Sequence, residues 1–131
     1  MEEQKQRLMT QVPKTAAGFN MDFKALKKDA DLQFSYLRRI PLATFKGYFT
    51  KTEVETAIFS EILRTLAEKV TSPEESKWAY DFLITLSKAF KFDMIMMFAE
   101  DAEVENIAKI VAKIREVDSA KADEIAEKYD D

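Results

Sequence analysis

The sequence of 131 residues contains no histidine and no cysteine, and only two glycines and three prolines. Without histidine the usual general base near neutral pH is missing, and without cysteine there is no thiolate nucleophile or thiolate metal ligand. The two glycines, Gly18 and Gly47, stand too far apart to form a loop that binds phosphate. The 24 acidic residues fall mostly on the expected solvent faces of helices, where charges are ordinary. We therefore predict that the chain is not an enzyme and has no catalytic residues, cofactor or metal.

Long apolar runs and a strongly basic surface are missing as well. No apolar run approaches the roughly 18 residues that a membrane span needs, and the first ten residues, MEEQKQRLMT, lack the apolar core of a secretory signal. The net charge is −4, with 11 basic and 8 acidic residues in positions 1–65 and 9 basic and 16 acidic residues in positions 66–131. Nucleic-acid binding needs a concentrated basic surface. We expect no nucleic-acid or membrane partner, and a location in the cytoplasm with the nucleus as a second compartment.

The first 18 residues differ in composition from the rest of the chain. They contain few apolar side chains and include Pro13 and Gly18. This composition is typical of a flexible arm or the end of a linker. We predict that the helical protein-interaction domain spans residues 19–131.

From residue 19 onward the apolar residues recur at three- and four-residue steps, as they do on one face of an α-helix. Val54, Ile58, Ile62 and Leu66 form the clearest such stripe. No segment alternates apolar and polar residues for long enough to indicate a strand. The sequence therefore predicts an all-α fold of about seven short helices, arranged either as a compact bundle or as a short right-handed superhelix.

Polar residues mark where several of these helices begin. In Ser72-Pro73-Glu74-Glu75, the Ser72 hydroxyl can accept a hydrogen bond from the backbone amide of Glu75 while the Glu75 carboxylate reaches back, which makes a capping box. The other expected starts are Asn20, Asp29 or Asp31, Pro41, Asp101, and Asp118 or Ser119. In the helix that begins at Asp101, the apolar side is expected to carry Val104, Ile107, Ala108, Val111 and Ile114.

The segment KFDMIMMFAED, residues 91–101, places six bulky apolar side chains within seven positions, interrupted only by Asp93. On a helix, residues 91, 94, 95 and 98 lie on one side and residues 92, 96 and 99 on another, so one buried stripe cannot hold all six. The helix is either central and buried all round, or partly exposed as a docking surface, for which flexible methionine side chains are suited. Asp93 is expected to be an acid of the first turn or an N-cap.

Two segments resemble one known family. The segment LSKAFKFDMIMMF, residues 86–98, resembles the C-terminal domain of RNA polymerase II-associated protein three, a helical domain that sperm-associated antigen and dynein-assembly proteins share. The segment FNMDFKALKKDADLQFSYLRRI, residues 19–40, is similar to the start of that domain, where a pattern of Phe, Asp-Phe and Leu precedes a helix with Tyr-Leu and Ile. Together these segments extend the resemblance over about residues 19–115, most of the chain.

The resemblance implies a non-catalytic adaptor. In that family, tetratricopeptide repeats upstream hold the ninety-kilodalton heat-shock chaperone, and the C-terminal domain docks on the ATPase face of RuvB-like AAA+ proteins. By this resemblance the chain is expected to bind a RuvB-like AAA+ ATPase. Upstream repeats would bring that ATPase to the chaperone for the assembly of protein complexes.

The resemblance also implies where the docking side lies. It places a basic residue and a methionine three positions later, here Lys91 and Met94, in contact with the partner. Family members often have arginine at the first of these positions, and lysine keeps its charge but loses its planar fork. Ile95 and Phe98 lie on the same side of the expected helix and complete the predicted partner-binding set. The core is expected for Phe92 and, in preference to the docking patch, for Phe98.

Two other functions stay open at this point. One is a domain of an axonemal dynein pre-assembly factor, which belongs to the same family. The other is a membrane-trafficking adaptor, because small helical superhelices also serve there and basic residues could meet acidic lipid head groups. The basic residues in question are Lys24, Lys27, Lys28, Arg38 and Arg39.

Overall fold

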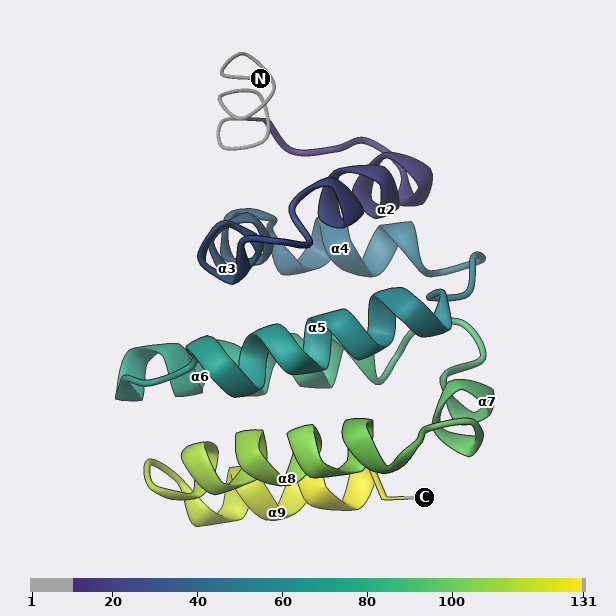
Figure 1. Ribbon diagram of the computed structural model, residues 1–131. Helices are drawn as coiled ribbons and strands as arrows, with labels where there is room; N and C mark the ends of the chain where they lie inside the picture. The colour runs from purple at the N-terminus through teal and green to yellow at the C-terminus, as the bar shows by residue number, and fades with distance from the viewer. Residues whose placement is uncertain (1–10, 131) are drawn as a thin grey trace.

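The computed structural model describes residues 11–130 of the chain (Figure 1). Within this range the chain forms eight α-helices and no strand. The all-α prediction is therefore confirmed, with one helix more than the expected seven. The helices are α2 (Ala16–Ala25), α3 (Ala30–Arg39), α4 (Leu42–Tyr48), α5 (Thr56–Lys69), α6 (Pro73–Leu86), α7 (Phe92–Met97), α8 (Asp101–Arg115) and α9 (Ser119–Lys128).

The helices stack in layers to form a compact domain (Figure 1). The first layer holds α2, α3 and α4, the second holds α5 and α6, and the third holds α8 and α9. Helices α3 and α4 contact α5 and α6, respectively, and both α5 and α6 contact α8. The short helix α7 lies at the edge of the stack, beside the start of α8. It is therefore the one helix placed outside the three layers in the described part of the chain.

Most of the predicted helix starts are confirmed. The Asp29 and Asp118 side chains cap α3 and α9 by accepting hydrogen bonds from backbone amides, and α8 begins at Asp101. The predicted start at Asn20 is wrong, because α2 begins at Ala16 and the Thr15 hydroxyl accepts a hydrogen bond from the Gly18 amide at 3.0 Å. The arm predicted for residues 1–18 falls mainly on residues 1–10, which lie outside the described residues, so its boundary stays a prediction.

The capping box at the start of α6 is confirmed as well. The Ser72 hydroxyl accepts a hydrogen bond from the Glu75 amide at 3.1 Å, and the Glu75 carboxylate accepts one from the Ser72 amide at 3.0 Å. The same carboxylate accepts hydrogen bonds from the amide and hydroxyl of Thr71. These bonds favour the charged form and lower the pKa of Glu75, with the Thr71 amide as the largest cause.

We expect Ser72→Ala to lower the free energy of unfolding by about 1 kcal/mol, because the substitution leaves the Glu75 amide without its partner. Urea denaturation followed by circular dichroism measures this loss. The control is Ser35→Ala, at an exposed position within α3, where the change should stay below about 0.5 kcal/mol. Equal losses in the two variants would contradict a capping role for Ser72.

The centre of the first layer is a cluster of aromatic rings around Phe19. Phe19 is completely buried. Its ring centroid lies 5.4 to 5.9 Å from those of five other rings, within the range of favourable aromatic pairs. These rings belong to Phe23, Tyr36, Phe45, Tyr48 and Phe49. The cluster therefore joins α2, α3 and α4 through one residue.

Two buried polar contacts accompany the ring cluster. The Tyr36 hydroxyl donates a hydrogen bond to the Asp22 carboxylate at 2.9 Å, and burial together with this contact raises the pKa of Tyr36. Between α3 and α5, the Thr65 hydroxyl donates to the side-chain oxygen of Gln33 at 3.2 Å. The Gln33 amide group donates in turn to the Phe23 carbonyl at 3.4 Å. Buried polar groups with partners of this kind fix how the helices pack.

Candidate functional site

The exposed apolar side chains gather in one short part of the sequence. In residues 11–130, seven large apolar side chains are exposed. Single exposed apolar residues are normal on a protein surface, whereas a cluster of them marks a docking site. Five of the seven lie within fifteen consecutive positions, namely Phe90, Met94, Met97, Phe98 and Val104. We call the set of Phe90, Met94, Met97 and Phe98 the α7 patch.

Helix α7 is held against the domain by its inner side. Phe92 and Met96 are buried, four positions apart on that side. The Phe92 ring makes edge contacts with Tyr129 at 5.1 Å and Phe59 at 6.4 Å between centroids. Tyr129 is itself buried, and its hydroxyl donates a hydrogen bond to the Leu83 carbonyl. Rings from α5 and from the end of α9 therefore hold α7 against the domain. The prediction that Phe92 lies in the core is confirmed.

The outer side of α7 carries apolar residues as well. Met94, Met97 and Phe98 are 46%, 69% and 66% exposed. Their spacing of three and four positions makes them neighbours on the helix surface. Of the two possibilities left open by the sequence, the partly exposed helix is the one observed. The core prediction for Phe98 is wrong, because its position faces away from the side that holds Phe92 and Met96.

The predicted docking set matches this surface in part. Met94 and Phe98 lie in the α7 patch, whereas Ile95 is half-buried and packs against the core. Met97 was absent from the predicted set, although it is the most exposed residue of the patch. A turn of 100° per residue places position 97 about 100° from position 96 and about 140° from position 92, away from the buried side. Once the buried pair is known, the same periodicity identifies Met97.

Lys91 precedes α7 instead of lying on its surface. It is the N-cap residue and has a left-handed backbone conformation, with φ of 57°. Its ammonium nitrogen lies 3.3 Å from the Glu53 carboxylate and 5.3 Å from the centroid of the Phe90 ring. Glu53 belongs to the loop between α4 and α5, and the Phe90 amide donates a hydrogen bond of 2.8 Å to the Phe49 carbonyl. Two loops therefore set a charged rim beside the α7 patch.

Asp93 fulfils the simpler of its predicted roles. It is an exposed acid in the first turn of α7, and Lys91 occupies the N-cap position. A negative charge in the first turn is favourable because backbone amides there carry partial positive charge. The rim of the α7 patch thus has one lysine and two acids, Glu53 and Asp93.

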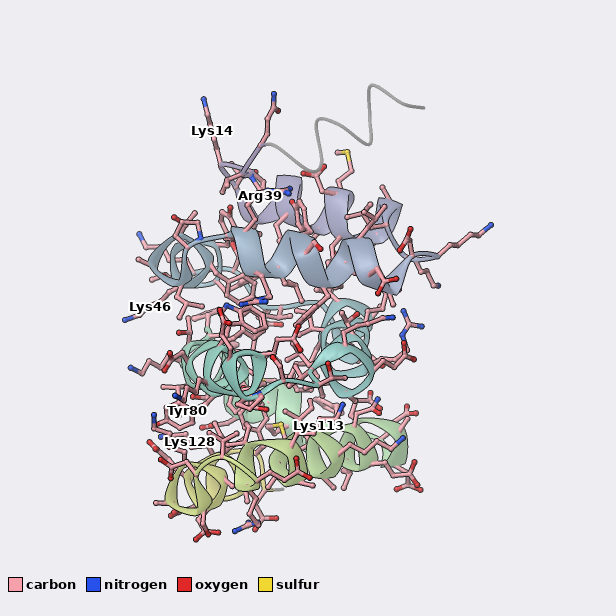
Figure 2. The ribbon with its side chains drawn as sticks, turned by 90° about the vertical axis from the view of Figure 1, so that its left-hand side faces the viewer. Lys14, Arg39, Lys46, Tyr80, Lys113 and Lys128 are labelled. Carbon is pink, nitrogen blue, oxygen red and sulfur yellow. The ribbon has the colours of Figure 1, made fainter. Side chains whose placement is uncertain are left out.

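Four of the five basic residues considered for lipid binding lie close to acids or rings. Lys24 is 2.8 Å from Glu55, and Lys27 is 3.9 Å from Glu61. Arg38 lies 3.9 Å from both Glu74 and Glu75, and Arg39 lies over the Tyr36 ring. Lys14 and Lys46 point outward (Figure 2). The positive charges are thus partly neutralised and do not form one uniform basic face.

Lys113 lies between the second and third layers (Figure 2). Its ammonium group donates a hydrogen bond to the Ala67 carbonyl near the end of α5. Burial lowers the pKa of Lys113, since desolvation disfavours the charged form. This contact ties α8 to α5, so we assign Lys113 to packing between the layers.

Across residues 11–130, no helix has the length and apolar character needed to cross a bilayer. Within the same range, no three side chains of histidine, cysteine, aspartate or glutamate gather as metal ligands would.

Comparison with protein families identifies a related family. Residues 12–104 match the family model described as the potential Monad-binding region of RPAP3. The matched range includes the whole of α2 to α7, and with them the α7 patch. It ends in the first turn of α8.

Comparisons with individual proteins agree with that match. The chain is 30% identical over 95 residues to RNA polymerase II-associated protein 3 of Xenopus laevis and 26% identical over 92 residues to the protein of the same name from Homo sapiens. These alignments cover 72% and 70% of this chain, which spans 14% of the length of each relative. The fold is similar to that in an NMR structure of the C-terminal domain of human RPAP3, with a TM-score of 0.77 and 23% identity. That similarity covers 92% of this chain and 90% of the other.

Proposed function

The chain belongs to the RPAP3 C-terminal domain family, and on that premise we propose that it is a non-catalytic docking domain for a RuvB-like AAA+ ATPase. In this proposal the α7 patch contacts the ATPase face of the partner. Repeats upstream in the full-length protein would hold the ninety-kilodalton heat-shock chaperone, so that the domain brings the ATPase to the chaperone in the cytoplasm, and also in the nucleus. The observation that carries the proposal is the concentration of exposed apolar side chains on α7.

The composition of the α7 patch supports binding to a protein surface. Methionine adapts to irregular pockets because its side chain is unbranched and polarizable. An aromatic ring beside two methionines, with a charged rim around them, matches the usual interface pattern of an apolar centre and polar edge. Full burial of Met94 in a partner pocket would contribute about 1.5–3 kcal/mol. A few contacts of this size account for most of the affinity of a typical interface.

The family description names a second candidate partner. It describes the matched region of RPAP3 as potentially binding Monad. The α7 patch lies within the matched residues, so the same surface is the one to test against Monad. Monad therefore belongs in the same binding experiment as the two RuvB-like paralogues.

The two alternative functions are dynein pre-assembly and membrane trafficking, and they relate to the α7 patch in different ways. Dynein pre-assembly would use the same domain in a different full-length protein, so the two cannot be told apart by this surface. Lipid binding would need free positive charge, and the ion pairs of Lys24, Lys27 and Arg38 reduce it. The exposed apolar side chains of α7 are a more direct match to a protein partner.

We expect Met94→Ala to weaken binding to the partner by about tenfold or more, because the variant loses the buried thioether. Isothermal titration of the purified domain with each RuvB-like paralogue and with Monad measures the dissociation constants. Met21→Ala is the matched control, since Met21 is 70% exposed but lies on α2, in the first layer. Its dissociation constant should stay within about twofold of the parent value.

Three outcomes of this titration decide the proposal. Binding to a RuvB-like paralogue that Met94→Ala weakens and Met21→Ala preserves supports it. Binding to Monad alone moves the function to the second partner. No binding to any of the three by a folded sample overturns the assignment of the α7 patch as a docking site for these proteins.

A further inference from the structure

An open apolar groove lies between α8 and α9. Its volume is about 530 Å³. Its lining residues are mostly small or apolar, and those on which the argument depends are Val104, Ala108, Ala112, Ala126 and Tyr129. The alanines leave room for another backbone to come close, because the distance between packed helices depends on the side chains at the contact. We call this feature the α8–α9 groove.

The other helices cover only part of the apolar side of α8. The sequence predicts that Val104 and Ala108 lie on the apolar side of this helix together with Ile107 and Val111. In the structure Ile107 and Val111 are buried, whereas Ala108 is exposed and Val104 is 49% exposed. Part of this apolar side is exposed because α8 and α9 form the last layer, with no described helix beyond them (Figure 1). One more helix on this face would cover the exposed part.

The α8–α9 groove is distinct from the α7 patch. The family match ends at residue 104, so all but the first of the groove residues lie beyond it. The two surfaces meet near Tyr129, which lines the groove and packs its ring on Phe92 of α7. The function of the groove therefore does not rest on the function proposed for the patch.

The charges around the groove restrict what can bind there. Among residues 101–130, seven acids and three bases are exposed. One of the bases, Arg115, is 2.8 Å from the Asp123 carboxylate, so these two charges offset each other. Arg115 lines the groove together with two acids, Glu116 and Asp130, so the acids outnumber the base there. A negative rim of this kind attracts cationic partners and repels anionic ones.

This charge decides between the possible occupants. A second copy of the chain would bring an equally acidic layer against the first, which is unfavourable. An anionic membrane would be repelled for the same reason. An amphipathic helix with basic flanks satisfies both the apolar groove and its acidic rim, in the common mode in which a helix occupies a groove.

We propose that the α8–α9 groove binds an amphipathic helix of another protein, with apolar side chains at three- and four-residue steps and lysine or arginine on its flanks. The apolar side chains of that helix lie over Val104, Ala108 and Ala112, and its alternate turns approach Ala126 on α9. Its basic residues face Glu116 and Asp130. The bound helix acts as the missing cover of the last layer.

Two designed peptides test this proposal. Both are about 18 residues long, which gives five helical turns, and both have the same leucine stripe. One carries lysine at its polar positions and the other carries glutamate. We expect the Leu–Lys peptide to bind the domain at least tenfold more tightly than the Leu–Glu peptide, as measured by fluorescence anisotropy. Raising the salt from about 50 to 300 mM should weaken the Leu–Lys complex, because salt screens exposed charges.

A pair of variants locates the binding site. Ala108→Arg places a long cationic side chain in the groove and should weaken the Leu–Lys peptide at least tenfold. Ala120→Arg makes the same change in charge at an exposed position of α9 that does not line the groove, and should weaken it less than threefold. Amide NMR shifts of the parent domain should move at Val104, Ala112 and Ala126. Circular dichroism confirms that both variants are folded.

Several results would overturn the proposal. Equal weakening by Ala108→Arg and Ala120→Arg would mean that net charge alone drives peptide binding. NMR shifts confined to Met94 and Met97 would place the peptide on the α7 patch instead. A dimer in sedimentation that Ala108→Arg dissociates would show that a second copy covers the groove. Ala108→Arg leaves the α7 patch intact, so the variant should bind a RuvB-like protein as tightly as the parent domain does. This measurement separates the proposal for the groove from the proposal for the patch.

Discussion

Phe19→Ala is expected to lower the free energy of unfolding by about 3–5 kcal/mol, the range for removal of a buried phenylalanine ring. Phe19 is fully buried, and its ring contacts five others from α2, α3 and α4. Its loss leaves a cavity that all three helices share. Urea denaturation followed by circular dichroism and by tyrosine fluorescence measures the change.

Two further variants make the Phe19 result interpretable. Phe19→Leu keeps most of the apolar volume and should cost less than about 1.5 kcal/mol, so a folded reference exists even if Phe19→Ala unfolds. Phe98→Ala is the matched control, because the same atoms are removed from a residue that is mainly exposed. Its effect should stay within about 0.5 kcal/mol. A Phe19→Ala loss no larger than that of Phe98→Ala would contradict the central place of Phe19 in the core.

Met94→Asp combined with Met97→Asp is expected to weaken partner binding by about a hundredfold or more. Each substitution removes apolar contact and would bury an unpaired carboxylate in the interface, which costs at least about 1–3 kcal/mol. Both side chains are exposed in the free domain, so the fold should be unaffected. Titration against the RuvB-like paralogues and Monad measures the effect.

The control for this double variant is Val12→Asp combined with Met21→Asp. It makes the same change in net charge at the two exposed apolar residues that lie outside positions 90–104 in the described range. A control variant with parental affinity shows that position, and not charge, determines the loss. If the two double variants lose affinity equally, the docking surface is not the α7 patch.

The positions of the helices could be predicted because their causes are local. Asp29, Ser72 and Asp118 cap helices through amides three residues later in the chain. The predicted start of α2 is too late because few apolar side chains, together with Pro13 and Gly18, indicate an arm over residues 1–18. Gly18 lies within α2, and burial of the Phe19 ring next to it outweighs the roughly 1 kcal/mol that a glycine costs in a helix.

The composition of the α7 patch could be predicted only in part. The sequence identifies α7 as too apolar for one buried stripe, and that interpretation is confirmed by the exposure of Met94 and Phe98. Which side of α7 faces the core depends on Phe59 and Tyr129, residues far away in the sequence. Periodicity fixes the relation between Met97 and Phe92, but not the direction in which either points. The same limit explains Val104, which is exposed because no helix among residues 11–130 covers that side of α8.

Because the ring of Tyr129 packs against Phe92, a fragment must extend to residue 129 to keep α7 in the position seen in the whole domain. The family match stops at residue 104, and a fragment trimmed to that range would keep every residue of the α7 patch. It would nevertheless lack Tyr129, whose ring packs against Phe92 of α7 and whose hydroxyl donates a hydrogen bond to the Leu83 carbonyl. If the α7 patch is the docking surface as proposed, a fragment that ends at residue 104 would bind the partner more weakly than the whole domain. The loss would not mean that residues after 104 contact the partner.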